Sequence, residues 1–234
     1  MRRLAGVHEF LDGPLNDPAT LRNNLRDMGR ANRITGGASL SRQAIDVLAP
    51  PPAPLAVLDV GTGGADIPLA LLAAARRGHR QVTVTAVDGR PEVLAAARAA
   101  RPDIDRTAAL VLDLADGRSL PYPDASFDVA HASLVLHHLE PADAISFLRE
   151  LARVARRGIV VNDLSRRRIT VLGSWLLSHA FTRNAYTRHD APLSARRAYT
   201  LAEAQSLLAQ AGLQPVFVTH GVFGHRWAIA AVRQ

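Results

Sequence analysis

The sequence of 234 residues contains neither cysteine nor lysine, so all 28 of its basic residues are arginine. The lack of cysteine excludes disulfides, thiol nucleophiles and zinc sites with thiolate ligands. Without lysine, the chain has no Schiff-base residue and no lysine for a Walker-type phosphate loop. Hydrophobic residues make up 48% and charged residues 21%. This composition is typical of a globular protein and excludes collagen, coiled coils and disordered chains.

Long apolar runs are also missing. The longest, residues 171–181, is interrupted by two serines and a histidine and is too short to cross a bilayer. No apolar stretch of signal-peptide length follows Met1, so we expect a cytoplasmic protein without a transmembrane segment. The formal net charge of +7 would suit nucleic acid, an anionic membrane or an acidic substrate. Because the arginines are scattered along the chain, we attribute the positive charge to a general replacement of lysine by arginine. A dedicated binding tail would concentrate them in one segment.

The N-terminal 49 residues are predicted to form a helical segment. Leucines at helical spacing follow Asp17 and Pro18, which suit a helix cap and a first helical turn. The proline-rich stretch 50–54 is read as a linker to the main domain, residues 55–234.

In that domain, strand and helix patterns alternate, which predicts an α/β fold with a Rossmann-like, mostly parallel sheet. Two further runs near the C-terminus, separated by glycines, predict an antiparallel hairpin and bring the sheet to seven strands. Ligands of such sheets bind beyond the carboxyl ends of the strands. The expected strands are 56–60, 81–87, 109–114, 127–132, 158–161, 215–219 and 226–232.

Residues 164–199 interrupt this alternation and are predicted to form a helical cap inserted after the fifth strand. Trp175, Phe181 and Tyr186 favour a cap over an aromatic or lipid-like acceptor, while core packing of a helix is the alternative. The sequence from Thr200 to Glu203 is a capping box that opens the next helix.

Glycines directly after the first strand predict a ligand cradle, since they let a ligand approach the backbone closely. Gly61 and Gly63 fit a dinucleotide fingerprint, but Asp66 stands where its third glycine belongs, which disfavours NAD and FAD. Asp88 ends the next strand and could accept from ribose hydroxyls, and Asp113 could accept from an adenine amino group. The pattern suits an adenosine with a cationic end and no phosphate. The alternative is a tight turn with surface carboxylates.

Several segments resemble the motifs of class I S-adenosylmethionine (SAM)-dependent methyltransferases. The glycine motif 57–64 resembles their first motif and 86–88 their second acidic strand end, while segments 113–114, 120–122, 127–129 and 136–139 match later motifs. The similarity is greatest to the small-molecule branch that includes ubiquinone and menaquinone biosynthesis methyltransferases. It covers residues 55–161 and the C-terminal hairpin.

This resemblance implies SAM as the cofactor and assigns residues to its parts. The glycine loop would hold the methionine part, with Asp59 orienting the loop. Asp88 would hold the ribose, Asp113 and the Leu114 amide the adenine, and His131 would lie near the sulfonium. The full set of expected cofactor-binding residues is Asp59, Gly61, Thr62, Gly63, Asp88, Gly89, Asp113, Leu114 and His131.

Two residues are candidate catalytic bases. Asp163 follows the fifth strand and His189 lies in the cap. Capping or pairing with Arg166 is the alternative for Asp163, and a solvated loop position is the alternative for His189. Since adjacent residues seldom face one another, His189 and Asp190 are not expected to pair. His137 and His138 are expected to be packing residues, and no residue spacing indicates a metal site.

The predicted function is SAM-dependent methylation of a small apolar or aromatic acceptor, such as a phenol, quinol or polyketide-like compound, most simply on oxygen. C-methylation of a quinone precursor and RNA methylation are alternatives, as is a non-catalytic binding module. His131 and Ser133 stand where amino-methylating nucleic-acid enzymes have an Asn/Asp-Pro-Pro-aromatic run. We therefore expect a small-molecule partner, no nucleic acid and a possible homodimer.

Overall fold

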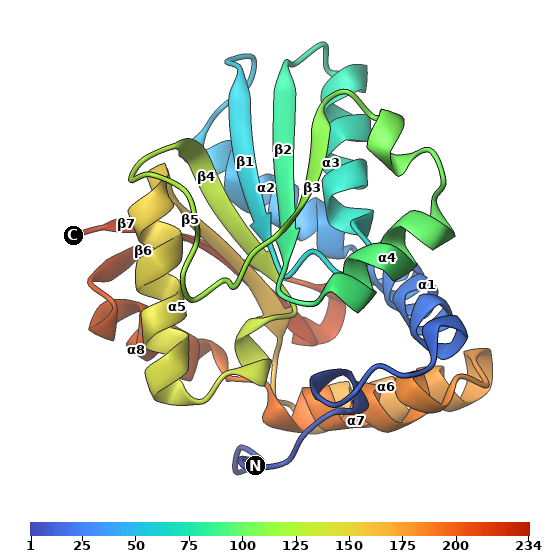
Figure 1. Cartoon of the computed structure of the whole chain (residues 1–234). Helices are drawn as coiled ribbons and strands as arrows, with labels where there is room; N and C mark the ends of the chain where they lie inside the picture. The colour runs from blue at the N-terminus through green and yellow to red at the C-terminus, as the bar shows by residue number, and fades with distance from the viewer.

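The computed structural model describes residues 1–234 and has a seven-stranded sheet with helices on both faces (Figure 1). The strand order is β3-β2-β1-β4-β5-β7-β6, in which β7 runs antiparallel to the other six strands. The predicted α/β sheet with its C-terminal hairpin is thereby confirmed. The strands are β1 (Leu55–Val60), β2 (Val82–Asp88), β3 (Leu110–Leu114), β4 (Phe127–Ser133), β5 (Ala155–Leu164), β6 (Leu213–His220) and β7 (Arg226–Arg233).

Helices connect the strands and precede the sheet. Asp17 caps the first of them by accepting from the Ala19 and Thr20 amides, as its sequence position predicts. The helices are α1 (Pro18–Ile34), α2 (Gly37–Leu48), α3 (Asp66–Arg77), α4 (Pro91–Ala100), α5 (Pro141–Val154), α6 (Arg168–Phe181), α7 (Ala185–Arg197) and α8 (Leu201–Gln210). Four short 3₁₀ turns complete the set: η1 (Phe10–Asp12), η2 (Ile104–Arg106), η3 (Leu136–His138) and η4 (Val222–Gly224).

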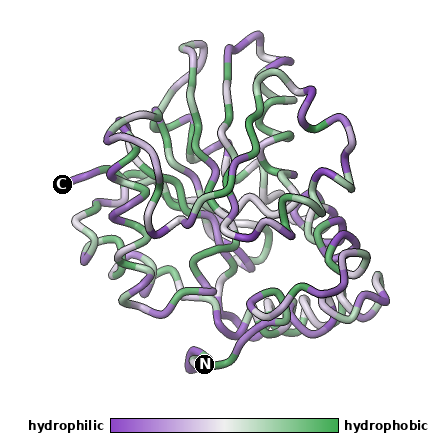
Figure 2. Tube along the Cα trace, in the orientation of Figure 1, coloured by the Kyte–Doolittle hydropathy of each residue, from purple (hydrophilic) through white to green (hydrophobic).

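The sheet is buried on both faces because its strands place apolar side chains on each side. On β7, Trp227 packs into the core formed with α5 and α8, while Ala228 packs into the core formed with α2 and α3. Successive side chains of a strand point to opposite faces, so this alternation fills both cores. Figure 2 shows the resulting hydrophobic colour along the central strands. Helix α2 therefore shares one core with the sheet that follows it.

Helices α6 and α7 form the segment inserted after β5, and they lie beside the carboxyl ends of the parallel strands (Figure 1). The N-terminal residues run along α7, where the Leu4 amide donates to the Arg196 carbonyl at 3.1 Å. None of the helices combines the length and apolar content that a bilayer crossing requires. The insertion and the N-terminal segment together enclose the edge of the sheet where ligands bind in this architecture.

A buried arginine connects the beginning of this insertion to α8. Arg166 donates to both carboxylate oxygens of Glu203, at 2.6 and 2.8 Å, and Glu203 also accepts from the Thr200 amide in the predicted capping box. The hydrogen bond from Arg166 lowers the pKa of Glu203 from 4.5 to about 2.

Because its folded-state pKa is depressed, the Glu203 carboxylate stabilises the fold above its ordinary pKa and loses this contribution as the pH falls toward 2. Glu203→Gln is therefore expected to lower the free energy of unfolding near neutral pH, and to lower it by a smaller amount near about pH 3. Urea unfolding of both proteins across this range measures the difference. A difference that does not shrink on acidification would contradict the assignment.

Candidate functional site

The glycine loop between β1 and α3 has a backbone that ordinary residues rarely adopt. Gly61 and Gly63 have φ angles of +72° and +53°, in the left-handed region. The Gly61 and Thr62 amides both donate to the Val87 carbonyl at 2.9 Å, which holds the loop against the end of β2. Leu25 of α1 covers the other side of the loop, next to Gly63 and Gly64. The loop is thus fixed between β2 and α1.

A methyl group at Gly61 is expected to distort this loop. Gly61→Ala places a residue with a side chain at positive φ, which costs about 1–2 kcal/mol, and its Cβ would clash with Cγ2 of Val135. We expect a lower melting temperature, and Val135→Ala in the same chain should restore part of it by removing the clash. Gly64→Ala is the matched control, since its Cβ would meet Leu25 at an ordinary 3.5 Å. Equal effects at Gly61 and Gly64 would contradict the prediction.

Asp88 connects the end of β2 to the glycine loop. Its Oδ2 accepts from the Gly63 amide and its Oδ1 from the Arg90 amide, both at 3.1 Å. Burial raises the pKa of its carboxyl. Gly89, next to it, is exposed. The carboxylate therefore lies directly beside the loop, as the sequence predicted.

Asp113 lies on the strand next to Asp88, since Val87 pairs with Asp113 and Asp88 with Leu114 in the parallel register. Asp113 is exposed and accepts from the Leu114 amide at 2.9 Å and from the Tyr122 hydroxyl at 3.0 Å. The acidic residues of β2 and β3 therefore share one edge of the sheet.

His131 is fully buried beneath this edge. Its Nδ1 lies 2.5 Å from Oδ1 of Asp59, its neighbour in the β1–β4 register, and its Nε2 lies 2.7 Å from the Ser41 hydroxyl. Asn162 donates to the Ser41 oxygen at 2.8 Å, so the Ser41 hydrogen is free to donate to His131. This arrangement assigns the His131 proton to Nδ1, where it is donated to Asp59. Both nitrogens of His131 are thus engaged within the protein, and its side chain has no exposed surface.

The polar network continues to a buried cation. Arg226 donates to Asn162 at 2.6 Å, to Asn32 at 2.7 Å and to Ser133 at 2.9 Å. Asn32 in turn donates to Asp66 at 3.0 Å, so the network extends from β1 to the first turn of α3. Sequence reasoning did not select Asn32, Arg226 or Ser41, because their proximity depends on the packing of α1, α2 and β7.

Asp163 is 1% exposed and lies inside β5, which continues three residues beyond the predicted end of this strand. It accepts from His137 Nδ1 at 2.7 Å, from the His137 amide at 3.1 Å and from the Leu164 amide at 2.6 Å. Burial opposes ionisation, but His137 keeps the pKa of Asp163 below its ordinary value. The candidate base is therefore enclosed by protein donors, and the atom it orients is Nε2 of His137.

His189 lies apart from this pair, on α7. Its ring stacks on Phe10 at 3.9 Å, and its Nδ1 lies 2.7 Å from Oδ1 of Asp190. The expectation that these adjacent residues do not pair is wrong. Asp190 is held by the Phe10 and Leu11 amides, and this fixed carboxylate lies within reach of the neighbouring ring. The two candidate catalytic residues are thus in different hydrogen-bonded groups.

Comparison with known proteins identifies the central part of the chain. Residues 58–161 match the family model described as a methyltransferase domain. The chain carries a methyltransferase domain. The resemblance to SAM-dependent methyltransferases in the sequence is confirmed for these residues. The methyltransferase domain includes the glycine loop, Asp88, Asp113 and His137, whereas Asp163 and His189 lie beyond the matched residues.

Two curated relatives are similar to parts of the chain. It is 35% identical over 102 residues to 27-O-demethylrifamycin SV methyltransferase of Amycolatopsis mediterranei, a match that covers 44% of this chain and 35% of the relative. It is 31% identical over 111 residues to the ubiquinone/menaquinone biosynthesis C-methyltransferase of a Geobacter species, covering 47% of this chain and 45% of the relative. The chain thus spans less than half the length of these curated relatives.

The methyltransferase domain and its surroundings also resemble solved structures. The mitomycin 7-O-methyltransferase superposes with a TM-score of 0.70 over 98% of this chain and 62% of its own, at 19% identity. At this identity the likeness supports the fold alone, and it extends to the helices before and after the sheet.

Proposed function

We propose that this protein is a SAM-dependent methyltransferase whose cofactor lies against the glycine loop. The observation that carries this proposal is the Asp88 carboxylate placed against the Gly63 amide within a methyltransferase domain. The remaining cofactor contacts are proposed for the residues predicted above, with Asp59 held by His131.

The chemistry of the loop fits such a cofactor. Thr62 Oγ1 is buried and has no hydrogen-bond partner in the protein, so it is free to bond a polar group of a ligand. When bound, SAM supplies an electrophilic methyl group on a sulfonium leaving group. Acidic residues at the ends of β2 and β3 suit the ribose and adenine. Because SAM carries no phosphate, its site does not need an arginine to pair with one. These features favour an adenosine with a cationic end.

For the acceptor, we propose a small apolar or aromatic molecule methylated on oxygen. Helix α6 supports this proposal because several of its large apolar side chains are about half exposed: Leu172 is 58% exposed, Trp175 48% and Leu176 50%. The relatives include both an O-methyltransferase and a C-methyltransferase, so they do not decide which atom is methylated, and oxygen is our own proposal. Holding the acceptor in line with the methyl group can lower the activation free energy of methyl transfer by about 7–11 kcal/mol.

In this proposal, Asp163 is a positioning residue. It holds Nδ1 of His137, and Nε2 therefore points away from β5 toward the N-terminal segment. We propose that the acceptor oxygen approaches this nitrogen, which lies on the cap side of the sheet. His189, paired with Asp190, is proposed to contact the acceptor from α7.

A direct test is calorimetric titration with S-adenosylhomocysteine (SAH), followed by methyl transfer from labelled SAM to a panel of phenols, quinols and RNA. We expect SAH binding and labelled phenol or quinol products, with the methylated atom identified by NMR. Absence of SAH binding would overturn the cofactor assignment. Labelling of RNA alone would overturn the small-molecule acceptor.

A further inference from the structure

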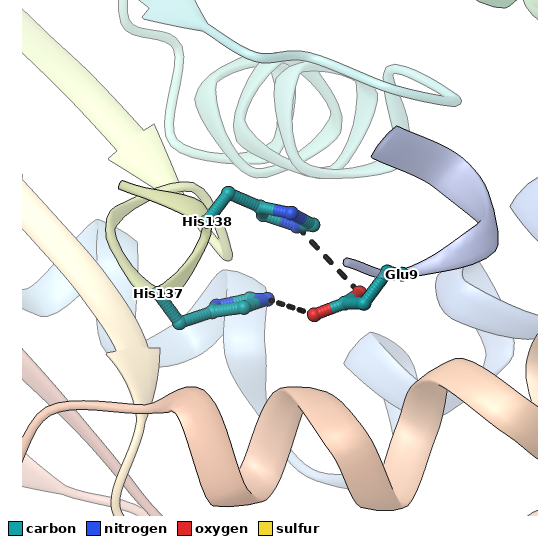
Figure 3. A group of neighbouring side chains, drawn as sticks. All are labelled: Glu9, His137 and His138. Carbon is teal, nitrogen blue, oxygen red and sulfur yellow. Dashed lines mark ion pairs between the residues drawn. The ribbon is translucent and has the colours of Figure 1, made fainter. Parts of the chain in front are cut away.

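Three side chains from distant parts of the chain meet beside η3. Glu9, just before η1, faces His137 and His138, which follow β4 (Figure 3). Glu9 and His137 are buried, and His138 is one-quarter exposed. One ligand atom from each of the three side chains lies within 4.8 Å of the other two. The group is thus compact and largely buried.

Both histidines present the same nitrogen to Glu9. Nδ1 of His137 is bonded to Asp163, and Nδ1 of His138 is bonded to Asp12, each at 2.7 Å. The two Nε2 atoms are left to face the Glu9 carboxylate, one toward each of its oxygens, at 3.7 and 3.8 Å. Histidines that bind metals are oriented in this way, with the second nitrogen donating to a carboxylate.

The distances within the group suit a shared ion better than direct hydrogen bonds. Separations of 3.7 and 3.8 Å exceed the hydrogen-bond range of about 2.7–3.2 Å. Two ligands of one tetrahedral zinc ion, with bonds of about 2.0–2.2 Å, lie roughly 3.3–3.6 Å apart, so the observed 3.7 and 3.8 Å exceed this range only slightly. The observed spacing therefore leaves room for an ion between the imidazoles and the carboxylate.

The charges of the surrounding side chains also favour a cation. Glu9, Asp12 and Asp163 contribute three carboxylates, and Arg197 contacts Glu9 at 3.3 Å and Asp12 at 2.6 Å. With both imidazoles neutral, one guanidinium leaves two negative charges uncompensated in a largely buried group. Burying unpaired charge is costly, so the group requires a divalent cation or two added protons.

We propose that Glu9, His137 and His138 bind a divalent metal ion, for which Zn²⁺ is the best match. Two histidines and one glutamate are a ligand set found in zinc sites that keep an open fourth position. No residue spacing in the sequence indicates such a site, because Glu9 lies far from the adjacent histidines along the chain. With the ion bound, Nε2 of His137 would be a ligand, and the acceptor oxygen would approach the open position of the metal instead of that nitrogen. This role rests on the proposed function, whereas metal binding does not.

The experiment is calorimetric titration of the untagged, chelator-treated full chain with ZnCl₂, with melting curves recorded with and without the metal. We expect one equivalent to bind and to raise the melting temperature, since an ion that binds the folded state stabilises it. Glu9→Gln and His138→Gln should weaken binding at least tenfold. Asp12→Asn keeps all three ligands but removes an orienting carboxylate and should weaken it about 10–100-fold.

His220→Gln is the matched control, because His220 is exposed on β6 and outside the group. Its zinc affinity should equal that of the unaltered chain, and SAH titration of every variant verifies its fold. The proposal is overturned if the unaltered chain binds no zinc. It is also overturned if Glu9→Gln and His138→Gln bind zinc unchanged, which indicates an adventitious ion only. Zinc binding without methyl transfer would instead count against the proposed function alone.

Discussion

Asp88→Ala is expected to weaken SAH binding at least tenfold. A carboxylate that accepts hydrogen bonds contributes about 1.5–3 kcal/mol per bond, and 1.4 kcal/mol corresponds to a factor of ten. The variant also releases the Gly63 amide from its partner at 3.1 Å, so the loop loses an anchor together with the ribose acceptor. Both effects act in the same direction, and calorimetric titration with SAH measures their sum.

Two further variants separate these contributions. Asp88→Asn retains an oxygen for the Gly63 amide but not the negative charge, so its affinity should lie between those of the unaltered chain and the alanine variant. Asp116→Ala is the control, because that carboxylate lies just after β3 but bonds to Arg118 instead of the loop. Unchanged SAH affinity in Asp88→Ala, or an equal loss in Asp116→Ala, would refute the assignment.

Asp163→Asn is expected to lower turnover by about 10²–10⁴-fold while leaving SAH affinity nearly unchanged, the range typical of disrupted proton transfer. Asp163 accepts from three N–H groups, two of them on His137. An asparagine has one oxygen acceptor and places an NH₂ group against at least one of those donors. His137 then loses its orientation and tautomer, and steady-state kinetics across pH, run beside SAH titration, measure the result.

A double-mutant cycle distinguishes positioning from general destabilisation. If Asp163 acts through His137, then Asp163→Asn should have little further effect on turnover once His137→Gln is present, since residues acting as a unit are not additive. Losses that multiply, or a single variant with full turnover at every pH, would show that Asp163 has no such role. Parallel losses of turnover and SAH affinity would indicate a disturbed fold instead.

The cofactor side of the site could be predicted because its parts are local in sequence. A strand, a glycine turn and an acidic strand end follow one another within residues 55–88. Parallel pairing of the strands places these features at one edge of the sheet, independently of the conformation of the other loops. The same holds for Asp17 and the Thr200 capping box, whose partners are two or three residues away. Their contacts with a cofactor stay predictions.

The acceptor side depended on contacts between segments far apart in the chain. The sequence suggests Asp163 as a base at a strand end, but β5 continues past it and η3 closes over it, so two of its three donors come from His137. His131 was expected near the sulfonium, yet α2 supplies the serine that engages its outer nitrogen. Side-chain type and spacing do not encode such burial.

The sequence by itself determined the alternation of strands and helices, the C-terminal hairpin and the glycine loop, because periodicity and turn residues act over a few positions. Only the tertiary structure decided which titratable groups meet. Glu9 reaches His137 and His138 because the N-terminal segment returns along α7, where the Phe10 and Leu11 amides bond to Asp190. Such proximity arises from the packing of whole elements, and no pattern along the chain records it.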